Sequence, residues 1–462
     1  MKKMLNPSAY LVGVFGLLIA ASSCLSFAQE NLATTLENRD IDRYKQQAER
    51  MAQGDVDLLW VGDSITHFWE GKGKEVWDKY YSERKAMNFA ISGDRTGHVL
   101  WRMENSPMDK ISPKMTVVMI GTNNIGHKKD NGEMHSTPAQ TVEGIQMIVD
   151  RLKGFYPETK ILLLEVFPRG NKADDPLRQA VNEINKGLEA IYANGAVENV
   201  QLYSINDLFL TKDGELPKEI MPDFLHPSQE GYEIWAKAIE PMIADGLGEN
   251  SVDTQPAPVD AEWWSKRFDE KNEILKKGDV DILMIGDSIT HGWESAGPDV
   301  WQKYYGDKKA INLGHGGDQT QHVLWRLENY DFSNVNPKAA VLLIGVNNTW
   351  GRDRQAKNIA LGQRRIVKKL RELFPEIKII VLKVFPCTNR DDQQENIDAI
   401  NEWTPFYMRD LPNVEVVDIG KVFLNKEGVL TKEIMPDLLH PNAVGYESWG
   451  AALYLKLEEL TK

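Results

Sequence analysis

The sequence predicts an α/β protein with two similar domains, each built on a parallel sheet that helices cover on both faces. The hexapeptide Gly-Asp-Ser-Ile-Thr-His at residues 62–67 returns at 286–291, which is 224 positions further on. A repeat this long indicates a duplicated domain, because solenoid units repeat every ~20 to 50 residues. Short apolar runs alternate with helical patterns in both copies, which is typical of parallel sheets. The length of 462 residues suits two domains of roughly 200 residues each.

The elements of the two copies follow the same order. Each copy opens with a charged segment that we expect to be helical, residues 41–53 in the first copy and 263–277 in the second. A short apolar run ended by glycine comes next and predicts a buried strand, at 57–61 and at 281–285. The first copy then continues with predicted strands and helices in alternation: strands at 115–120, 160–166 and 200–204, and helices at 140–152 and 177–191.

The ends of the predicted domains are marked by changes in composition. Lys2 and Lys3 precede an apolar stretch, and small residues at 26–28 suit a cleavage site, so residues 1–28 predict a signal peptide and a secreted or periplasmic protein. The apolar stretch is shorter than the ~20 residues that a spanning helix needs. Cys24 after small residues leaves a lipoprotein anchor as an alternative. We place the first domain at 29–245, a polar linker at 246–260 and the second domain at 261–462.

The bulk composition excludes several classes of function. The chain has 54 basic and 68 acidic residues, a net charge of −14, and no long basic run, so nucleic-acid binding is not expected. Cys387 is the one cysteine after the predicted signal peptide, so neither a disulfide framework nor a cysteine metal site is expected. We expect no cofactor and no metal.

Comparing the two copies selects candidate catalytic residues. Ser64 and Ser288 form the one aligned serine pair in the first half of the repeat, and each follows a predicted strand. The carboxyl ends of parallel strands border the crevice where ligands bind, so these side chains are expected there. Taken alone, a serine in this position is more often the N-cap of a helix.

A histidine follows an acid by three residues in both copies. Asp223 precedes His226, and Asp437 precedes His440. In a helical turn or a compact loop this spacing lets the carboxylate hold one ring nitrogen, while the other nitrogen accepts a proton from serine. A metal site is the alternative, but neither copy offers a matched set of further ligands near it.

Candidates for stabilising a negative oxygen also recur. Asn123 and Asn347 follow apolar strands, so their amides are expected in the same crevice. Gly93 and Gly317 follow another short strand, where a glycine lets a backbone N–H approach a ligand closely. Either element alone could be a simple turn. The order serine, glycine, asparagine and Asp-His in both copies favours a catalytic site.

These four blocks resemble those of the SGNH (GDSL) hydrolases, and each copy covers a whole domain of that type. Residues 93–102 and 317–326 also resemble the catalytic subunits of intracellular platelet-activating factor acetylhydrolase. The resemblance implies two flavodoxin-like three-layer α/β/α domains. The implied roles are nucleophiles Ser64 and Ser288, bases His226 and His440, orienting acids Asp223 and Asp437, and oxyanion donors in the backbone N–H groups of Ser64, Gly93, Ser288 and Gly317 and the side chains of Asn123 and Asn347.

Other residues shared by the copies are assigned structural roles. Asp63 and Asp287 adjoin the serines, but neighbours on an extended turn point apart. We interpret the paired histidines as satisfied polar groups near the site and the paired tryptophans as packing residues: His67/His291, His98/His322, Trp69/Trp293 and Trp101/Trp325. The first copy has six extra residues within 127–138, directly after its Asn-Asn pair, while the second carries Trp350 there.

Together these features predict a secreted serine esterase with a Ser-His-Asp triad in each domain. The expected substrate is a short-chain acyl ester, in particular an acetyl ester on carbohydrate. Two alternatives stay open: a phospholipid acetylhydrolase like the family it resembles, and a carbohydrate- or lipid-binding protein with one or both sites inert. The two domains could also pair within the chain.

Overall fold

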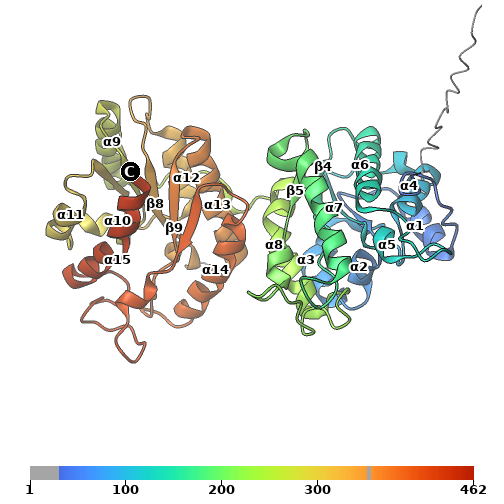
Figure 1. Ribbon diagram of the computed structural model, residues 1–462. Helices are drawn as coiled ribbons and strands as arrows, with labels where there is room; N and C mark the ends of the chain where they lie inside the picture. Colours follow the sequence, from blue (N-terminus) through green and yellow to red (C-terminus); the bar gives the residue numbers. More distant parts are fainter. Residues whose placement is uncertain (1–30, 351–354, 462) are drawn as a thin grey trace, which may run out of the picture.

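The computed structural model describes residues 31–350 and 355–461 and contains two parallel sheets of five strands each (Figure 1). The predicted signal peptide, with Cys24, lies outside the described residues. The first sheet has the strand order β2-β1-β3-β4-β5, and the second has the same order, β7-β6-β8-β9-β10. This is the flavodoxin-like order of a doubly wound sheet. The predicted α/β class and the two flavodoxin-like units are confirmed.

The first sheet and its helices lie between residues 42 and 247. Its strands are β1 (Leu58–Gly62), β2 (Ala86–Asn88), β3 (Met115–Met119), β4 (Lys160–Leu164) and β5 (Val200–Tyr203). Its helices are α1 (Asp42–Ala52), α2 (Ser64–His67), α3 (Lys74–Tyr81), α4 (Thr96–Asn105), α5 (Thr122–Gly126), α6 (Pro138–Phe155), α7 (Pro176–Tyr192) and α8 (Gln229–Leu247).

The second sheet repeats this plan between residues 262 and 461. Its strands are β6 (Ile282–Gly286), β7 (Ala310–Gly314), β8 (Ala339–Leu343), β9 (Lys378–Leu382) and β10 (Val414–Val417). Its helices are α9 (Glu262–Lys277), α10 (Ser288–His291), α11 (Pro298–Tyr305), α12 (Thr320–Asn329), α13 (Ala356–Leu373), α14 (Gln393–Met408) and α15 (Ala443–Thr461). A short 3₁₀ turn, η8 (Val346–Thr349), stands where the first domain has α5.

Each sheet is buried on both faces, which explains why its strands are continuous apolar runs. All five residues of β1 are buried. Leu59 and Val61 pack into one core with residues of α4, α6 and α7. Leu58 and Trp60 point the other way, into a second core with residues of α3 and α8. Two cores separated by one sheet give the three layers α/β/α.

Local sequence signals fix where the helices begin and end. Thr137 and Gln140 form a capping box at the start of α6, and Pro138 occupies its first position. The Asp175 side chain accepts the backbone N–H of Leu177 at 2.8 Å at the start of α7. These helices and the strands agree with the predicted segments to within a few residues.

The predicted linker lies partly against the second domain. The sequence predicts a polar linker at 246–260, yet Asp253 is 1% exposed. The carbonyl oxygen of Asp253 accepts a hydrogen bond from the Thr320 hydroxyl at 2.7 Å, at the start of α12. The backbone N–H of Ala257 donates to the carbonyl of Gln321 at 3.2 Å. The connection is therefore anchored along part of its length.

The two domains contact each other through helices that are not equivalent in the two copies. Helix α8 and its neighbours in the first domain lie against α13 and α14 in the second (Figure 1). The rings of Tyr80 and Trp403 meet at a centroid distance of 6.2 Å. Arg364 is buried and binds Asp245 of the first domain at 2.9 Å while also pairing with Asp410 of its own domain at 2.6 Å. The two domains of the chain therefore pair with each other.

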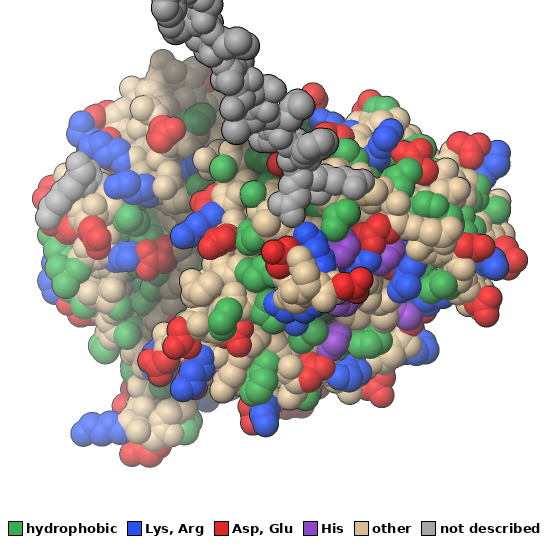
Figure 2. Space-filling model, turned by 45° about the vertical axis from the view of Figure 1, so that its right-hand side comes forward, with side chains coloured by type: hydrophobic (Ala, Val, Ile, Leu, Met, Phe, Trp, Pro, Cys, Tyr) green, Lys and Arg blue, Asp and Glu red, His purple; other side chains and the backbone are tan. Residues whose placement is uncertain are grey.

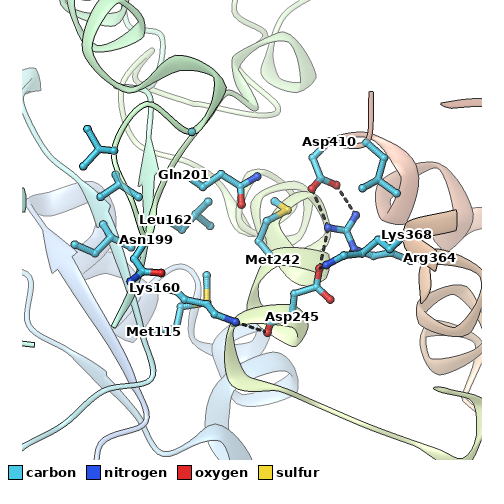
Figure 3. Close-up of a pocket in the computed structure, with 16 residues that line it drawn as sticks. Met115, Lys160, Leu162, Asn199, Gln201, Met242, Asp245, Arg364, Lys368 and Asp410 are labelled. Carbon is cyan, nitrogen blue, oxygen red and sulfur yellow. Dashed lines mark hydrogen bonds and ion pairs between the residues drawn. The ribbon is translucent and has the colours of Figure 1, made fainter. Parts of the chain in front are cut away.

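A cavity of about 410 Å³ lies at this domain contact and includes none of the predicted site residues. Figure 3 shows Arg364 between Asp245 and Asp410, with Lys368 beside them. The charges in the cavity wall are therefore largely neutralised by one another.

In the described part of the chain, no helix has the length and apolar character to cross a membrane.

Candidate active site

Ser64 stands at the first position of α2, just beyond the carboxyl end of β1. Gly62, the last residue of β1, has no room for a side chain, because a Cβ there would lie 2.5 Å from the carbonyl oxygen of Met119 on β3. Asp63 is the N-cap, and its Oδ1 accepts the backbone N–H of Ile65 at 3.0 Å. Asp63 therefore caps the helix, as its structural assignment predicts, and the Ser64 hydroxyl is left for another partner.

That partner is His226. The Nε2 atom of His226 lies 2.9 Å from Ser64 Oγ, and its Nδ1 atom lies 2.7 Å from Asp223 Oδ2. Asp223 Oδ1 also accepts the backbone N–H of His226 at 2.8 Å. Phe224, between the acid and the histidine, has a φ of 56°. The Asp-x-x-His segment is therefore a compact turn with one left-handed residue, and it brings the predicted triad together.

The second domain has the same chain of hydrogen bonds. Ser288 Oγ lies 2.8 Å from His440 Nε2, and His440 Nδ1 lies 2.6 Å from Asp437 Oδ2. Leu438, the counterpart of Phe224, has a φ of 61°. The two domains differ in many residues around the site but hold these three side chains in one geometry.

The predicted oxyanion donors also converge on the serine edge of each sheet. One N–H of the Asn123 side chain donates to the carbonyl of Asp94 at 3.0 Å, and Asn347 makes the same bond to Asp318 at 2.9 Å. An amide nitrogen has two N–H groups, so one remains for a ligand. This bond places the asparagine next to the loop that carries the predicted glycine.

The glycine of that loop has a backbone conformation that other residues rarely adopt. Gly93 has a φ of +80° and Gly317 a φ of +73°. The backbone N–H groups of Ser64, Gly93, Ser288 and Gly317 donate to no acceptor among the residues that the structure describes. These groups are available to bind a negatively charged oxygen.

Two carboxyl groups lie near each nucleophile, and their pKa values shift in opposite directions. Burial raises one pKa, and hydrogen bonds lower the other. Burial raises the pKa of Asp63, and likewise of Asp287, to about 7. Partial burial also acts to raise the pKa of Asp223, but hydrogen bonds from the side chain and backbone of His226 outweigh it and lower that pKa. Asp223 is therefore a carboxylate at neutral pH and suits the role of partner to histidine.

Of the remaining paired residues, three histidines and the tryptophans have the structural roles that their sequence positions predict. The His291 side chain hydrogen-bonds to no described residue, and Gly316 stands where the first domain has Ser92. His67 Nδ1 lies 2.8 Å from the Ser92 hydroxyl, and His98 Nδ1 accepts the backbone N–H of Arg95 at 3.0 Å. His322 accepts the backbone N–H of Gln319 at 3.0 Å in the same way. Trp69 and Trp293 are fully buried, and the partly buried Trp101 and Trp325 contact Tyr44 and Trp264.

The extra residues of the first domain fold back beside the site. His127 N–H donates to the carbonyl of Asn123 at 3.0 Å, and Ser136 N–H donates to the carbonyl of Asn124 at 2.9 Å, so the loop 127–137 starts and ends at α5. His127 Nδ1 lies 3.0 Å from Arg95 Nη1, and Glu37 bonds to Arg95.

This charged cluster is not apparent from the sequence because its members come from distant segments. Glu37 precedes α1, Arg95 caps α4, and His135 Nε2 lies 3.7 Å from Glu37 Oε2. Figure 2 shows histidine side chains gathered among acidic and basic side chains on one face of the first domain. Within the described residues, no group of three or more His, Cys, Asp and Glu side chains could hold a metal ion.

Comparison with known proteins places both halves of the chain in one family of sequences. The model of the GDSL-like Lipase/Acylhydrolase family matches residues 60–234 and 284–447. Platelet-activating factor acetylhydrolase IB subunit alpha2 of Gallus gallus is 34% identical over 220 residues, which is 47% of this chain and 90% of the relative. The alpha1 subunit of Homo sapiens is 31% identical over 206 residues, 44% of this chain and 83% of the relative.

Solved structures similar to this chain match one domain each. A GDSL-like lipase from Bacteroides thetaiotaomicron is 19% identical, with a TM-score of 0.35, over 44% of this chain and 97% of that structure. Axe2, an acetylxylan esterase from Geobacillus stearothermophilus, is 20% identical, with a TM-score of 0.33, over 42% of this chain and 94% of that structure.

Proposed function

Because the chain belongs to the GDSL-like lipase/acylhydrolase family, we propose that it hydrolyses short-chain acyl esters, acetyl esters in particular, at a Ser-His-Asp triad in each domain. The observation that carries this proposal is the hydrogen-bonded chain of Ser64, His226 and Asp223, which recurs as Ser288, His440 and Asp437. A serine hydroxyl is a weak nucleophile alone, and an adjacent base held by a third group activates it.

The reaction follows from the positions of these atoms. Ser64 Oγ attacks the ester carbonyl while His226 Nε2 takes the hydroxyl proton. The tetrahedral intermediate then expels the alcohol, which receives that proton from His226, and an acyl-serine remains. Water attacks the acyl-serine with His226 again as the base, and the carboxylic acid leaves as Ser64 regains its proton.

The neighbouring groups stabilise the charges that arise in these steps. Asp223 holds His226 Nδ1 and offsets the positive charge that the ring gains. The N–H groups of Ser64 and Gly93 and the free N–H of Asn123 would bind the oxyanion. Removing one such donor typically costs about 10²- to 10³-fold in kcat. Ser288, Gly317 and Asn347 have the same roles in the second domain.

The proposed acyl group is acetyl, and the proposed alcohol is a carbohydrate. Relatives about a third identical over one domain are named acetylhydrolases, which supports a small acyl group. The carbohydrate part rests on location: the predicted signal peptide at 1–28 would send the protein out of the cytoplasm, where acetylated polysaccharides are met. A lipoprotein anchor at Cys24 would lead to a similar environment.

A phospholipid substrate is the second candidate, since the relatives are platelet-activating factor acetylhydrolase subunits. Release of acetate from a panel of acetylated glycans and acetylated lipids separates the two candidates. A fluorophosphonate probe tests whether either site is inert, because it labels only serines that a base activates. Labelling of Ser64 and Ser288 would support two active sites, whereas an unlabelled chain would favour a binding protein.

A further inference from the structure

The two candidate sites differ at one position that follows the fourth strand of each sheet. Val166-Phe167-Pro168 and Val384-Phe385-Pro386 follow the fourth strand of each sheet, and the next residue is Arg169 in the first domain and Cys387 in the second. Resting on the function proposed above, we propose that Arg169 is a specificity-determining residue that makes the first site prefer esters whose alcohol part bears a negatively charged group, a carboxylate or a phosphate.

The Arg169 side chain lies between the segments that carry the catalytic groups. Its Nη1 donates to the carbonyl oxygen and to the hydroxyl of Thr122, each at 3.0 Å, directly before Asn123. The next residue, Gly170, donates its backbone N–H to the carbonyl of Phe224 at 2.9 Å, between Asp223 and His226. The guanidinium charge also interacts with the carboxyls of Asp63, Asp175 and Asp223.

Much of the hydrogen-bonding capacity of this guanidinium is unused. Arginine has five N–H donors, and among the described residues Nε and Nη2 of Arg169 donate to no acceptor. Their fork geometry matches a carboxylate or a phosphate, which can accept two parallel hydrogen bonds. A cation with free donors beside the triad therefore suits an anionic substrate.

The second domain shows that the catalytic geometry does not need this arginine. Cys387 is buried, and its thiol donates to Asn389 Oδ1 at 3.1 Å. Val346 stands where the first domain has Thr122, so the second domain lacks the hydroxyl that accepts a hydrogen bond from Arg169. The Ser288 to His440 distance is nevertheless 2.8 Å, against 2.9 Å for Ser64 to His226. The role of Arg169 is therefore selectivity.

The second domain has an arginine of its own near the loop that carries Asn347, and its guanidinium is already engaged. The Arg390 guanidinium lies 5.0 Å from the ring centre of Trp350, a side chain that is 56% exposed, and it donates to Gln393 and, at 3.4 Å, to the Thr349 hydroxyl. This contact has the distance of a cation–π pair, so the arginine charge is partly taken up by the ring. The two sites thus present different chemistry to the alcohol part of an ester.

The test uses the full chain with one active site at a time. In the Ser288→Ala background, kcat/KM is measured for acetyl esters of a neutral methyl hexoside, of the matching uronic acid and of the matching sugar phosphate, with Arg169→Cys and Arg169→Lys as variants. Thr122→Val is the matched control, since it removes one partner of Arg169 but keeps the charge. Hydrolysis of 4-nitrophenyl acetate reports separately whether the site is an esterase.

We expect Arg169→Cys to lower the ratio of anionic to neutral kcat/KM by about 10- to 100-fold, because charge-assisted hydrogen bonds are lost. Thr122→Val should keep most of the preference and Arg169→Lys only part of it, because an ammonium keeps the charge but lacks the fork of donors. Added salt should weaken the preference only where a cation remains. The kcat/KM values for the uronic acid ester and for the sugar phosphate ester then show which of the two anions the first site prefers. The proposal is overturned if both kinds of substrate lose activity equally, or if the enzyme cleaves 4-nitrophenyl acetate without preferring either anionic ester. Failure to cleave 4-nitrophenyl acetate would count against the proposed function instead.

Discussion

Asp223 and His226 are joined by two hydrogen bonds, one between side chains at 2.7 Å and one from the histidine backbone N–H to Oδ1 at 2.8 Å. The left-handed φ of 56° at Phe224 closes the turn that makes both bonds possible. The acid therefore fixes the histidine ring and the loop that carries it, and the second domain repeats this with Asp437 and His440.

Removing the charge of this acid should impair catalysis in the domain that carries it. Asp223→Asn, tested in the Ser288→Ala background, should lower kcat by about 10⁴-fold, because an amide favours the wrong tautomer of the histidine. Hydrolysis of 4-nitrophenyl acetate measures the loss. Asp213→Asn, at an exposed position of the same domain, is the control and should keep full activity. A loss under threefold in Asp223→Asn would show that this acid does not orient His226.

The loop 127–137 should give the first site its own substrate selectivity. Both ends of the loop bond to α5, and Glu37 lies near Arg95 and His135 at its side. Glu37→Gln should therefore change kcat/KM ratios across short-chain aryl esters and acetylated oligosaccharides in the Ser288→Ala enzyme. The same substitution in the Ser64→Ala enzyme, where only the second site acts, is the control. If the Ser64→Ala and Ser288→Ala enzymes have the same kcat/KM ratios across these esters, the loop does not shape selectivity.

The buried Asp63 should make stability depend on pH. Its pKa is raised to about 7 by burial, against an ordinary value of 3.8, so between these pH values the folded protein holds a proton that the unfolded chain has lost. Stability therefore falls as pH rises through this interval, by up to about 1.4 kcal/mol per pH unit for each such group, and levels off above pH 7.

Asp63→Asn tests this dependence because asparagine can still cap α2 without a charge. Its gain in melting temperature over the parent protein should be larger at pH 8 than at pH 4. Asp287→Asn should behave alike, since burial raises the pKa of Asp287 to about 7 too. A gain that does not change with pH would contradict this assignment.

The domain contact should depend on one buried arginine. Arg364 is 3% exposed at its side chain and neutralises Asp245 and Asp410, so Arg364→Met would leave two carboxyls with less compensation. We expect a loss of about 3 kcal/mol in the free energy of unfolding, measured with urea. Arg409→Met removes the pair with Asp207, whose side chain is 68% exposed, and should cost less than about 1 kcal/mol. Equal losses would show that Arg364 does not hold the contact.

The sequence predicts the strands well because they obey short-range rules, whereas the members of the triad are selected by comparing the two copies and by their resemblance to a family. An apolar run between glycine and a charged turn, such as the one before Ser64, has few alternatives to a buried parallel strand. The helix-cap alternative for Ser64 is wrong, since Asp63 occupies the cap. The parallel topology brings the ends of β1 and β3 and the Asp-x-x-His turn to one edge, so residues 162 positions apart are hydrogen bonded.

Features that rest on contacts between distant surfaces could not be predicted in this way. In the sequence, Arg364 is an ordinary basic residue in an amphipathic helical pattern. Its burial depends on α8 of the other domain, which the pattern does not indicate. Arg169 differs from Cys387 in the sequence, but its closeness to Thr122 depends on the path of its side chain. The polar composition of the linker gives no sign that Asp253 is buried.

Ser64 and Ser288 are proposed to be the two nucleophiles of one esterase. The most direct test compares hydrolysis of 4-nitrophenyl acetate by the parent protein, by Ser64→Ala, by Ser288→Ala and by the double variant. Each single variant should retain part of the activity, and the double variant should lose about three or more orders of magnitude in kcat, because nucleophile and base act as a unit. Turnover near the parent level in a folded double variant would contradict the serine mechanism.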